Sequence, residues 1–379
     1  GIGFVGIGLV VNLLTSTLGP AAQGMVKRFG LSLTVIDVGW PTTASATWAS
    51  PVAPIIIPVC LGVNLILIYF KLTKTLNIDL WNYWHFIVAG AFGYVVTGSY
   101  IWAIICAIIM ELLVLFTADK TAKYVGDFYG LEGVCLPTGS TASFAPLGFL
   151  VGKIVEKIPV IGNIHTDPDT IQKKFGIFGE PMMMGIILGF VLGGLAGYDV
   201  SKVFNTGISM GAVMFLMPRM VKILMEGLIP ISEAVRDYLQ SKYGDRELYI
   251  GLDAALATGH PAVLSTALIL VPITLFLAVI LPGNRVLPFG DLATIPFYIA
   301  FIVCFRKGNI VQSVITGTIV IALSLYMATD LAPVHTELLS QANMLPKGTT
   351  MVSSIDAGGN LYKWGIYKLS EMVKAMGLF

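Results

Sequence analysis

The sequence predicts an all-α polytopic membrane protein, and its composition and charge pattern support that prediction. Of the 379 residues, 56% are hydrophobic and only 12% are charged, whereas soluble domains carry about 25% charged residues. No Asp, Glu, Lys or Arg occurs from Leu80 to Met110 or from Ala254 to Asn284. Each of these gaps exceeds the ~20 apolar residues that a helix needs to cross a bilayer. The formal net charge of +1 favours neither a nucleic-acid binder nor a strongly acidic surface.

The first residues, "GIGFVGIGLVV", are already apolar and carry no basic flank. They lack the charged start and the cleavage site of a signal peptide, so we expect a further segment to precede Gly1. The four cysteines stand in apolar surroundings without paired spacing, at Cys60, Cys106, Cys135 and Cys304. This pattern predicts buried, inert thiols rather than a disulfide framework or a zinc site.

Apolar runs give the expected membrane helices in order along the chain. They lie at about 1–21, 49–70, 84–116, 181–198, 206–230, 261–282, 292–304 and 310–330. The run from Trp84 to Phe116 is too long for one crossing and contains "TGS" at 97–99. We therefore expect two short helices that meet at this break.

Two further segments mix apolar residues with Gly, Pro, Ser and Thr: "GLEGVCLPTGSTASFAPLG" (130–148) and "TTMVSSIDAGGNLYKWG" (349–365). Irregular backbone at membrane depth persists only where it is buried in protein or lines a wet cavity. The sequence therefore predicts re-entrant hairpins at about 130–150 and 349–372.

A polar linker at 163–180 divides the chain into halves that resemble each other. The matches keep their order at offsets of 210 to 219 residues, pairing Pro20 with Pro230, "VIDVG" (35–39) with "YIGLD" (249–253), Pro58 with Pro272, "DLWNYWHFI" (from 79) with "DLATIPFYI" (from 291), Thr97-Gly98 with Thr316-Gly317, and "KIVEKIP" (153–159) with "KLSEMVK" (368–374). Such duplication is frequent in transporters, which bind substrate near the bilayer midplane between broken helices. With about five crossings in each half, the two copies must be inverted.

The segments "IDVGWP" (36–41) and "GLDAALATGHP" (251–261) occupy corresponding places in the two halves. Each combines an acid with a ring, Asp37 with Trp40 and Asp253 with His260, just before an apolar crossing. An acid near hydrocarbon depth costs several kcal/mol unless it is paired or wetted, so both acids are candidates for function. The structural alternative is that both acids cap the helices that follow.

The two hairpins supply a second group of polar residues. Glu132 in the first and Asp356 in the second form a further acidic pair, which we interpret as symmetric. The tips "PTGST" (137–141) and "SSIDAGG" (353–359) offer hydroxyls and backbone N–H groups. Carboxylates, hydroxyls and amides suit a sugar alcohol, with a ring such as Trp40 against its C–H face. The alternative is that these hydroxyls only satisfy a bent backbone.

Among the remaining polar residues, His85 is the strongest candidate for a contact with a polyol. It lies beside Trp81 and Trp84, which an interfacial aromatic belt explains. Structural roles account for the others, namely helix caps for Asp79 and Asp291, a helix start for Glu180, and solvated loops for His165 and His335.

The sequence contains no P-loop, HExxH, CxxC or nucleophile elbow. We therefore expect no cofactor, no metal site and no catalytic residue in this chain. Two other readings remain open at this point. One is an ion-coupled secondary transporter that uses Asp37 and Asp253 as proton or sodium sites. The other is a membrane-embedded enzyme with Glu132 and Asp356 as an acid–base pair.

At "IDVGWP", "FGEP", "AGYDV", "GLDAAL…GH" and "LPGNRVLPFGDLAT", the chain resembles the galactitol-specific IIC components of the bacterial phosphotransferase system, which belong with the ascorbate-type permeases. The resemblance covers nearly the whole chain. It implies a homodimer in the inner membrane, in which each protomer has a dimerising V-motif domain and a substrate-holding core domain. On this basis we expect V-motif parts at 1–30 and 181–245 and core parts at 31–162 and 246–379.

The resemblance also implies a mechanism. The IIC component takes galactitol or a related hexitol from the periplasm, and the core domain moves against the V-motif domain. The substrate is then phosphorylated by a phosphocysteine on a separate IIB protein, itself charged by IIA, so no cysteine of this chain should be phosphorylated. The substrate contacts carried over by position are Asp37, Gly39, Trp40, His85, Thr138, Ser140, Asp253 and His260. Thr138 departs from a histidine often found at the hairpin tip, so the identity of the polyol is less constrained than the family.

Overall fold

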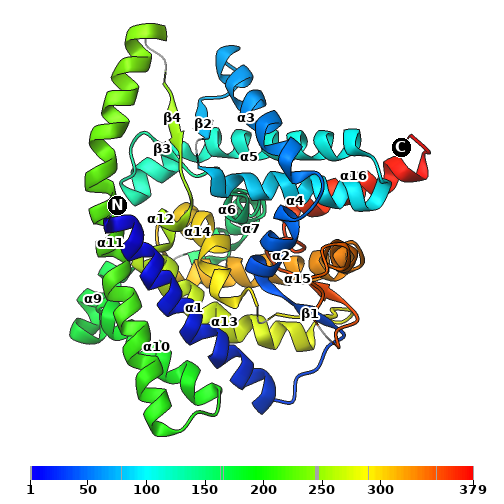
Figure 1. Ribbon diagram of the computed structural model, residues 1–379. Helices are drawn as coiled ribbons and strands as arrows, with labels where there is room; N and C mark the ends of the chain where they lie inside the picture. The colour runs from blue at the N-terminus through cyan, green and yellow to red at the C-terminus, as the bar shows by residue number, and fades with distance from the viewer. Residues whose placement is uncertain are drawn as a thin grey trace.

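The computed structural model describes residues 2–77, 79–162, 164, 166–243, 247–288, 290–346 and 348–378 (Figure 1). Within this part of the chain, five helices are long and apolar enough to cross a membrane: α1 (Ile2–Arg28), α5 (Tyr100–Tyr129), α11 (Val200–Tyr243), α13 (Pro261–Ile280) and α15 (Ile310–Gln341). A sixth candidate is the pair formed by α2 (Gly39–Trp48) and α3 (Ala53–Tyr69), which is bent by 95°. These helices confirm the prediction of a helical, polytopic membrane protein.

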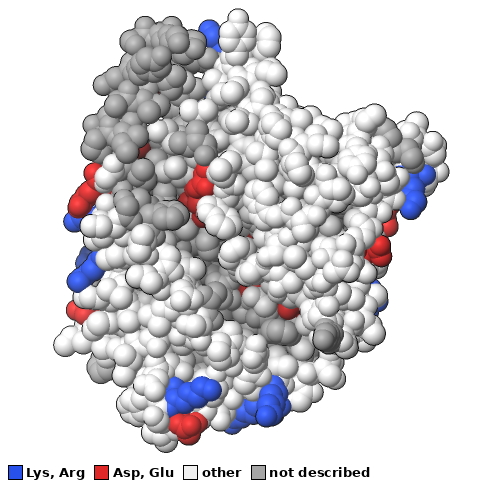
Figure 2. Space-filling view, viewed as in Figure 1, with Lys and Arg blue, Asp and Glu red and all other residues white. Residues whose placement is uncertain are grey.

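The surface agrees with this assignment. Figure 2 shows a face that is largely uncharged, with most Lys and Arg side chains near its edges. Large apolar side chains point outward on several spanning helices, including Leu9, Leu65, Phe116, Ile208 and Phe276. Lipid tails solvate such side chains, whereas water does not.

The long apolar run after Trp84 is divided as the sequence predicts. Helix α4 (Leu80–Thr97) ends at Gly98, which has a left-handed backbone with φ of 73°. Ser99 then accepts a hydrogen bond from the Trp102 N–H and begins α5. The expectation of two short helices is wrong for the second, because α5 runs for 30 residues. No breaker interrupts it before the left-handed cap at Gly130.

Two small parallel sheets, which the sequence did not reveal, join strands from the two halves of the chain. One has the strand order β5 (Val286–Leu287), β1 (Val35–Asp37), β6 (Val352–Ser353), and the other has the order β2 (Thr75–Asn77), β4 (Tyr249–Gly251), β3 (Val134–Cys135). In the first sheet Ile36 pairs with Leu287 and Val352. In the second Ile250 pairs with Leu76 and Val134. The middle strand of each sheet therefore comes from the opposite half of the chain from its two neighbours.

The two segments predicted as hairpins are each built from a short strand, a turn and a helix. After β3 come α6 (Gly139–Ala142), α7 (Ala145–Glu156) and the short α8 (Pro159–Gly162). After β6 come a turn and α16 (Leu361–Ala375). The two segments contact each other, because Asn360 Nδ2 donates to the Gly139 carbonyl at 2.9 Å.

The segment predicted as a linker is partly helical. It contains α9 (Pro168–Phe175) and a 3₁₀ turn, η1 (Gly176–Gly179). Asp167 caps α9 by accepting from the Thr170 N–H at 2.9 Å, and Pro168 occupies the first helical turn. These are ordinary helix-start signals within a polar sequence. His165 lies outside the described residues.

Helices α1, α10 (Pro181–Leu195) and α11 pack together on the left in Figure 1. Gly185, Gly189 and Gly193 form one face of α10, and a side chain at any of them would meet α11 within about 3 Å. Small residues at four-residue spacing let membrane helices approach closely. The remaining elements, α12 (Ala255–Thr258), η2 (Leu292–Thr294) and α14 (Ile295–Phe305), belong with the two sheets in the other part of the molecule.

Candidate functional site

The stretch "IDVGWP" forms the junction between β1 and α2, and the Asp37 side chain is fully buried there. Asp37 Oδ1 accepts from the Gly39 N–H at 3.0 Å, and Oδ2 accepts from the Asp291 N–H at 2.9 Å. Gly39 has φ of +75°, and a Cβ there would lie 3.0 Å from the Gly290 carbonyl oxygen. Only glycine fits this turn without strain, and the turn presents the carboxylate of Asp37 to the second half of the chain.

Asp291 is the hub of the site, although the sequence suggested a helix cap. Its Oδ1 accepts from the Trp40 N–H at 2.7 Å. Its Oδ2 accepts from the Ser354 hydroxyl at 2.5 Å and from the Asp356 N–H at 3.0 Å. The cap expectation is wrong, because η2 has no side-chain cap and the fully buried carboxylate turns toward α2 and the second hairpin instead.

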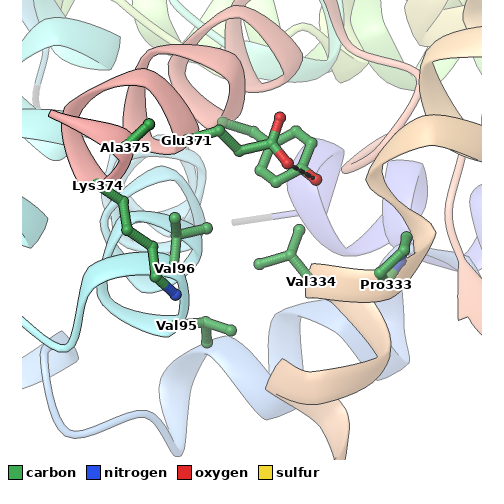
Figure 3. A pocket seen from close by; sticks show the side chains of 8 residues that line it. Val95, Val96, Pro333, Val334, Glu371, Lys374 and Ala375 are labelled. Atoms are coloured by element: carbon green, nitrogen blue, oxygen red, sulfur yellow. Dashed lines mark hydrogen bonds between the residues drawn. The ribbon is translucent and has the colours of Figure 1, made fainter.

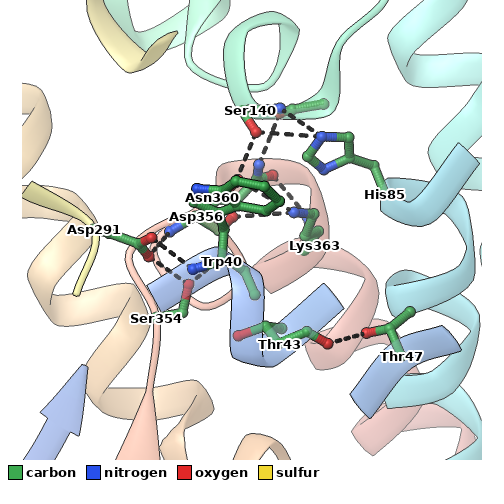
Figure 4. A network of polar contacts seen from close by, with 12 residues as sticks. Trp40, Thr43, Thr47, His85, Ser140, Asp291, Ser354, Asp356, Asn360 and Lys363 are labelled. Atoms are coloured by element: carbon green, nitrogen blue, oxygen red, sulfur yellow. Dashed lines mark hydrogen bonds and ion pairs between the residues drawn. The ribbon is translucent and has the colours of Figure 1, made fainter. Parts of the chain in front are cut away.

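Asp356 joins the two hairpins (Figure 4). Its Oδ2 accepts from the Ser140 hydroxyl at 2.7 Å. The ammonium group of Lys363, on α16, lies 3.1 Å from the Asp356 carbonyl and 3.5 Å from Oδ1. Both members of this ion pair are buried, with side-chain exposures of 0% and 1%. Lys363 also lies 4.6 Å from the centre of the Trp84 ring, in a cation–π contact.

His85 lies at the first hairpin tip. Its Nε2 accepts from the Ser140 N–H at 3.3 Å, so the proton of a neutral ring is on Nδ1. Within the described part of the chain, Nδ1 is buried and has no hydrogen-bond partner. Gly139 allows this packing, since a Cβ there would lie only 2.5 Å from His85 Cγ. The His85 ring therefore offers one unused donor at the centre of the polar network.

Indole rings cover one side of this network. Trp40 lies 6.5 Å from both Trp81 and Trp84, and Trp84 lies 4.1 Å from the His85 ring, measured between ring centroids. Trp40 is only half-buried, whereas Trp84 is buried. Ring faces beside carboxylates and an imidazole provide the two kinds of surface that a polyhydroxylated chain requires.

A second, related arrangement surrounds Asp253 at the junction of β4 and α12. Asp253 Oδ1 accepts from the Ala255 N–H at 2.7 Å, as Asp37 does from Gly39. The Asp253 N–H donates to Asp79 Oδ2 at 3.1 Å. Asp79 also accepts from the Trp81 N–H at 3.0 Å, which confirms its predicted role as the cap of α4.

Thr138 connects this second arrangement to α4. Its hydroxyl accepts from the Ala254 N–H and donates to Asn82 Oδ1, both at 2.8 Å. Thr138 is buried, and Asn82 is fully buried. The hydroxyl therefore acts as acceptor and donor at once, which a histidine at this position would do with a longer reach.

Burial and mutual repulsion disturb the ionisation of these acids. Burial and the neighbouring Asp356 charge raise the pKa of Asp291 to about 6. Burial, together with the charges of Asp79 and Asp356, raises the pKa of Asp253 to about 6. Burial and the Asp291 carboxyl raise the pKa of Asp37 well above its usual value. Burial lowers the pKa of Lys363, and the Asp356 carboxylate opposes that change.

Two candidate residues lie apart from this network. Glu132 is exposed and precedes β3, whereas Asp356 is buried and follows β6, so their interpretation as a symmetric pair is wrong. His260 caps α13 by accepting from the Ala262 N–H at 3.2 Å, and its ring lies 4.5 Å from that of Phe128. Burial lowers the pKa of His260 to about 4.

The structure also corrects the expectation for His335. This residue lies inside α15 and is fully buried, with Nε2 3.1 Å from the Thr43 hydroxyl. The polar residues that follow it continue the helix to Gln341 instead of forming a solvated loop. The four cysteines, in contrast, are buried and free, as predicted.

Three buried residues of the network were missed from the sequence: Asn82, Asn360 and Lys363. The last two fall in the irregular stretch 349–365, which the sequence predicts as the second hairpin. Lys363 could have been found from the sequence, because Asn360 is a typical helix cap and Lys363 follows it by three residues. Asn360 caps α16 by accepting from the Lys363 N–H, so Lys363 lies in the first turn of this helix, beside the hairpin tip.

A cavity of about 420 Å³ lies elsewhere, between α4, α15 and α16 (Figure 3). Its walls are mainly Val95, Val96, Pro333 and Val334, with Glu371 and Lys374 on α16. No lining residue belongs to the polar network around Asp291 and Asp356. We therefore treat the network, and not this cavity, as the candidate site.

Comparison with known proteins identifies the family. The model for the "PTS system sugar-specific permease component" family, EIIC-GAT, matches residues 1–348. The chain is 44% identical over 364 residues to the "PTS system galactitol-specific EIIC component" of Escherichia coli K12, covering 96% of this chain and 80% of that protein. A protein of the same name in E. coli O157:H7 matches equally well. A "Putative permease IIC component" of E. coli K12 is 39% identical over 372 residues, covering 98% of this chain and 85% of that protein. The chain thus belongs to the family of sugar-specific permease components of the phosphotransferase system.

Proposed function

We propose that the chain is the permease subunit of a phosphotransferase system and carries galactitol or a closely related hexitol across the bacterial inner membrane. The buried polar network that joins the two halves through Asp37, Asp291, Asp356, Ser140 and His85 carries this proposal. The 44% identity to a protein named as galactitol-specific supports the choice of polyol.

The chemistry of the network suits a neutral polyol. Each hydroxyl of the substrate donates one hydrogen bond and accepts others, and carboxylates are strong acceptors. Asp356 and Asp253 provide acceptors, and the Nδ1–H of His85 provides a donor. Trp40 presents a half-buried ring to the C–H face of the substrate.

The proposed movement rests on two units of the fold. The V-motif domain comprises 1–30 and 181–245, and it forms the homodimer. The core domain comprises 31–162 and 246–379 as two inverted repeats with re-entrant hairpins, and it carries the substrate by moving against the V-motif domain. The close packing of α1, α10 and α11 supports the first unit, and the reciprocal exchange of middle strands supports the second. Alternating access by such rocking is common among transporters with inverted repeats.

The polyol is phosphorylated as it reaches the cytoplasm, and the phosphoryl group comes from a partner protein. A phosphocysteine of the IIB subunit, charged by IIA, transfers its phosphoryl group to a hydroxyl oxygen of the polyol. The S–P bond breaks as an O–P bond forms, the thiolate leaves with IIB, and the hydroxyl proton passes to solvent. In this scheme the permease contributes binding and position, and no cysteine of its own reacts.

Reconstitution in vesicles tests the proposal. Labelled galactitol is supplied outside, with or without phosphorylated IIB inside, and the internal product is analysed. We expect galactitol phosphate to accumulate only when phosphorylated IIB is present. Uptake of unmodified galactitol that requires a proton or sodium gradient would instead indicate an ion-coupled secondary transporter. Chemical turnover that needs neither IIB nor a gradient would indicate a membrane-embedded enzyme.

A further inference from the structure

The cavity between α4, α15 and α16 lies at one end of the contact between α4 and α16. At the other end of this contact, the Lys363 ammonium lies 4.6 Å from the centre of the Trp84 ring, in the candidate site. Each helix continues from there for about three turns to the cavity, which α4 lines with Val95 and Val96. The cavity is therefore a gap in the packing that holds the second hairpin against α4.

The wall of the cavity is apolar. Val334 is buried and Val95 and Val96 are half-buried, and they border a volume of about 420 Å³. Sites for small molecules commonly have volumes of about 300–1,000 Å³. Because these side chains offer no hydrogen bond, the wall suits a hydrocarbon chain better than a polar ligand.

The rim of the cavity carries two exposed charged residues, Glu371 and Lys374. The Glu371 carboxylate already has partners, because it accepts from the Tyr367 hydroxyl at 2.6 Å and from the Lys368 ammonium at 2.9 Å. Lys374 has no ion-pair partner among the residues that the structure describes. Figure 3 shows its side chain beside Val96, with the Glu371 carboxylate pointing away from it. The rim therefore presents one uncompensated positive charge.

The cavity lies where the apolar part of the neighbouring helices ends. Helix α15 has no charged residue from 310 to 329, and Asp330 and Glu337 follow. At the turn between α4 and α5, the rings of Tyr94 and Tyr100 lie 4.8 Å apart. Tyrosines and the first charged residues of a spanning helix mark the membrane–water interface. The cavity is therefore at the depth of the lipid headgroups.

We propose that this cavity binds an anionic phospholipid, with an acyl chain against the valine wall and the headgroup phosphate beside Lys374. The free ammonium group selects a lipid with net negative charge over a zwitterionic lipid of the same chain length. The bound lipid fills the open end of the contact between α4 and α16. It stabilises the second hairpin in the described position, because a ligand that binds only the folded state favours that state.

Native mass spectrometry of the purified full chain in a mild detergent tests the inference. The protein is titrated with dioleoyl phosphatidylglycerol or with dioleoyl phosphatidylcholine, which have the same acyl chains. We expect the anionic lipid to bind about fivefold more tightly, and equal affinity would overturn the inference. Glycerol phosphate has no acyl chain and should not compete at the same concentration. Competition by it would also overturn the inference, because the site would then recognise phosphate alone.

Variants locate the binding in this cavity. Lys374→Gln should reduce the affinity for phosphatidylglycerol to that for phosphatidylcholine, whereas Lys123→Gln, at an exposed position on α5, should leave the preference unchanged. Val95→Phe fills the cavity and should weaken both lipids by at least about tenfold. Ala375→Phe fills it from the exposed side of α16 if Val95→Phe does not fold. Val279→Phe makes the same substitution at a position of α13 that is 49% exposed, and should change neither affinity.

Thermal unfolding gives a second readout. Phosphatidylglycerol should raise the unfolding temperature of the wild type more than that of Lys374→Gln. An unaltered preference in Lys374→Gln, or wild-type affinity in both Val95→Phe and Ala375→Phe, would overturn the inference. Weaker dimer formation in these two filled variants, with lipid binding unchanged, would assign the cavity to an interface between copies of the chain and would overturn it as well.

Discussion

Replacement of Lys363 by methionine removes the positive charge of the buried ion pair and keeps a side chain of similar length. At 3.5 Å and an effective dielectric constant of about 20, the attraction between Lys363 and Asp356 is about 5 kcal/mol. Removing one partner of a buried pair typically costs about 3–5 kcal/mol, because the other charge remains buried alone. We therefore expect Lys363→Met to lower the free energy of unfolding by about 3–5 kcal/mol.

The measurement is denaturant unfolding in detergent micelles, followed by the fluorescence of the Trp40, Trp81 and Trp84 cluster. Lys368→Met is a matched control on the same helix. Lys368 pairs with Asp330 and Glu371, but its side chain is 35% exposed, so its loss should cost at most about 1 kcal/mol.

A double-mutant cycle isolates the pair from other effects of the substitution. In an Asp356→Asn background the carboxylate is absent, and Lys363→Met should then cost clearly less than it does alone. If Lys363→Met destabilises the protein no more than Lys368→Met does, Lys363 does not neutralise a buried carboxylate, and the charge assignment of the site is wrong.

Four further predictions concern the junctions of the site. Gly39→Ala should destabilise the protein by about 1–3 kcal/mol in the same unfolding assay, because φ is +75° and the new Cβ would lie against Gly290. Gly30→Ala, with φ of +62° and open space around the residue, should destabilise the protein less. An equal loss of stability in the two variants would exclude the contact with Gly290 as the cause. Asp253→Asn should weaken galactitol binding more than about tenfold in calorimetry if the carboxylate accepts from the substrate, whereas unchanged affinity with lower stability would mark it as a cap only. Burial raises the pKa of Asp253 to about 6, from about 3.9 in the unfolded chain. The stability contributed by its bound proton is therefore complete below about pH 4 and is lost as the pH rises through about 6. Asp253→Asn should remove this part of the pH dependence of stability, and an unaltered pH profile would contradict the raised pKa of Asp253. Thr138→Val should cost about 1–3 kcal/mol, because its buried partners lose both a donor and an acceptor, and Thr138→Ser should restore most of the stability, which a purely steric role would not allow.

The sequence was informative where the physical signal is local. Apolar runs predicted α1, α5, α11, α13 and α15, but the runs at 181–198 and 292–304 form only the shorter helices α10 and α14. The Thr97–Ser99 break appeared where Gly98 adopts a left-handed backbone. Glycine and proline in "IDVGWP" marked a turn, and Gly39 is the residue that the turn requires. The family also followed from local motifs, as the comparisons show.

Features that depend on distant partners were not predictable in this way. The strands are only two or three residues long, which is too short to show an alternating pattern. Asp291 has the local sequence of a helix cap, and its role depends on distant partners such as Trp40, which lies 251 positions away in the sequence. Glu132 and Asp356 were paired because both are acids in similar segments. Their positions relative to the strands differ, because Glu132 precedes β3 whereas Asp356 follows β6.

The exchange of middle strands has a consequence for how such a chain could arise and be divided. Neither half of the sequence contains a complete sheet, because β1 inserts between β5 and β6 and β4 inserts between β2 and β3. An ancestor that contained only one of the two repeats could have completed its sheets only by exchanging strands with a second molecule, as a domain-swapped dimer does. Cleavage between α9 and α10 should accordingly leave two fragments that stay associated, because each fragment supplies the middle strand of a sheet in the other.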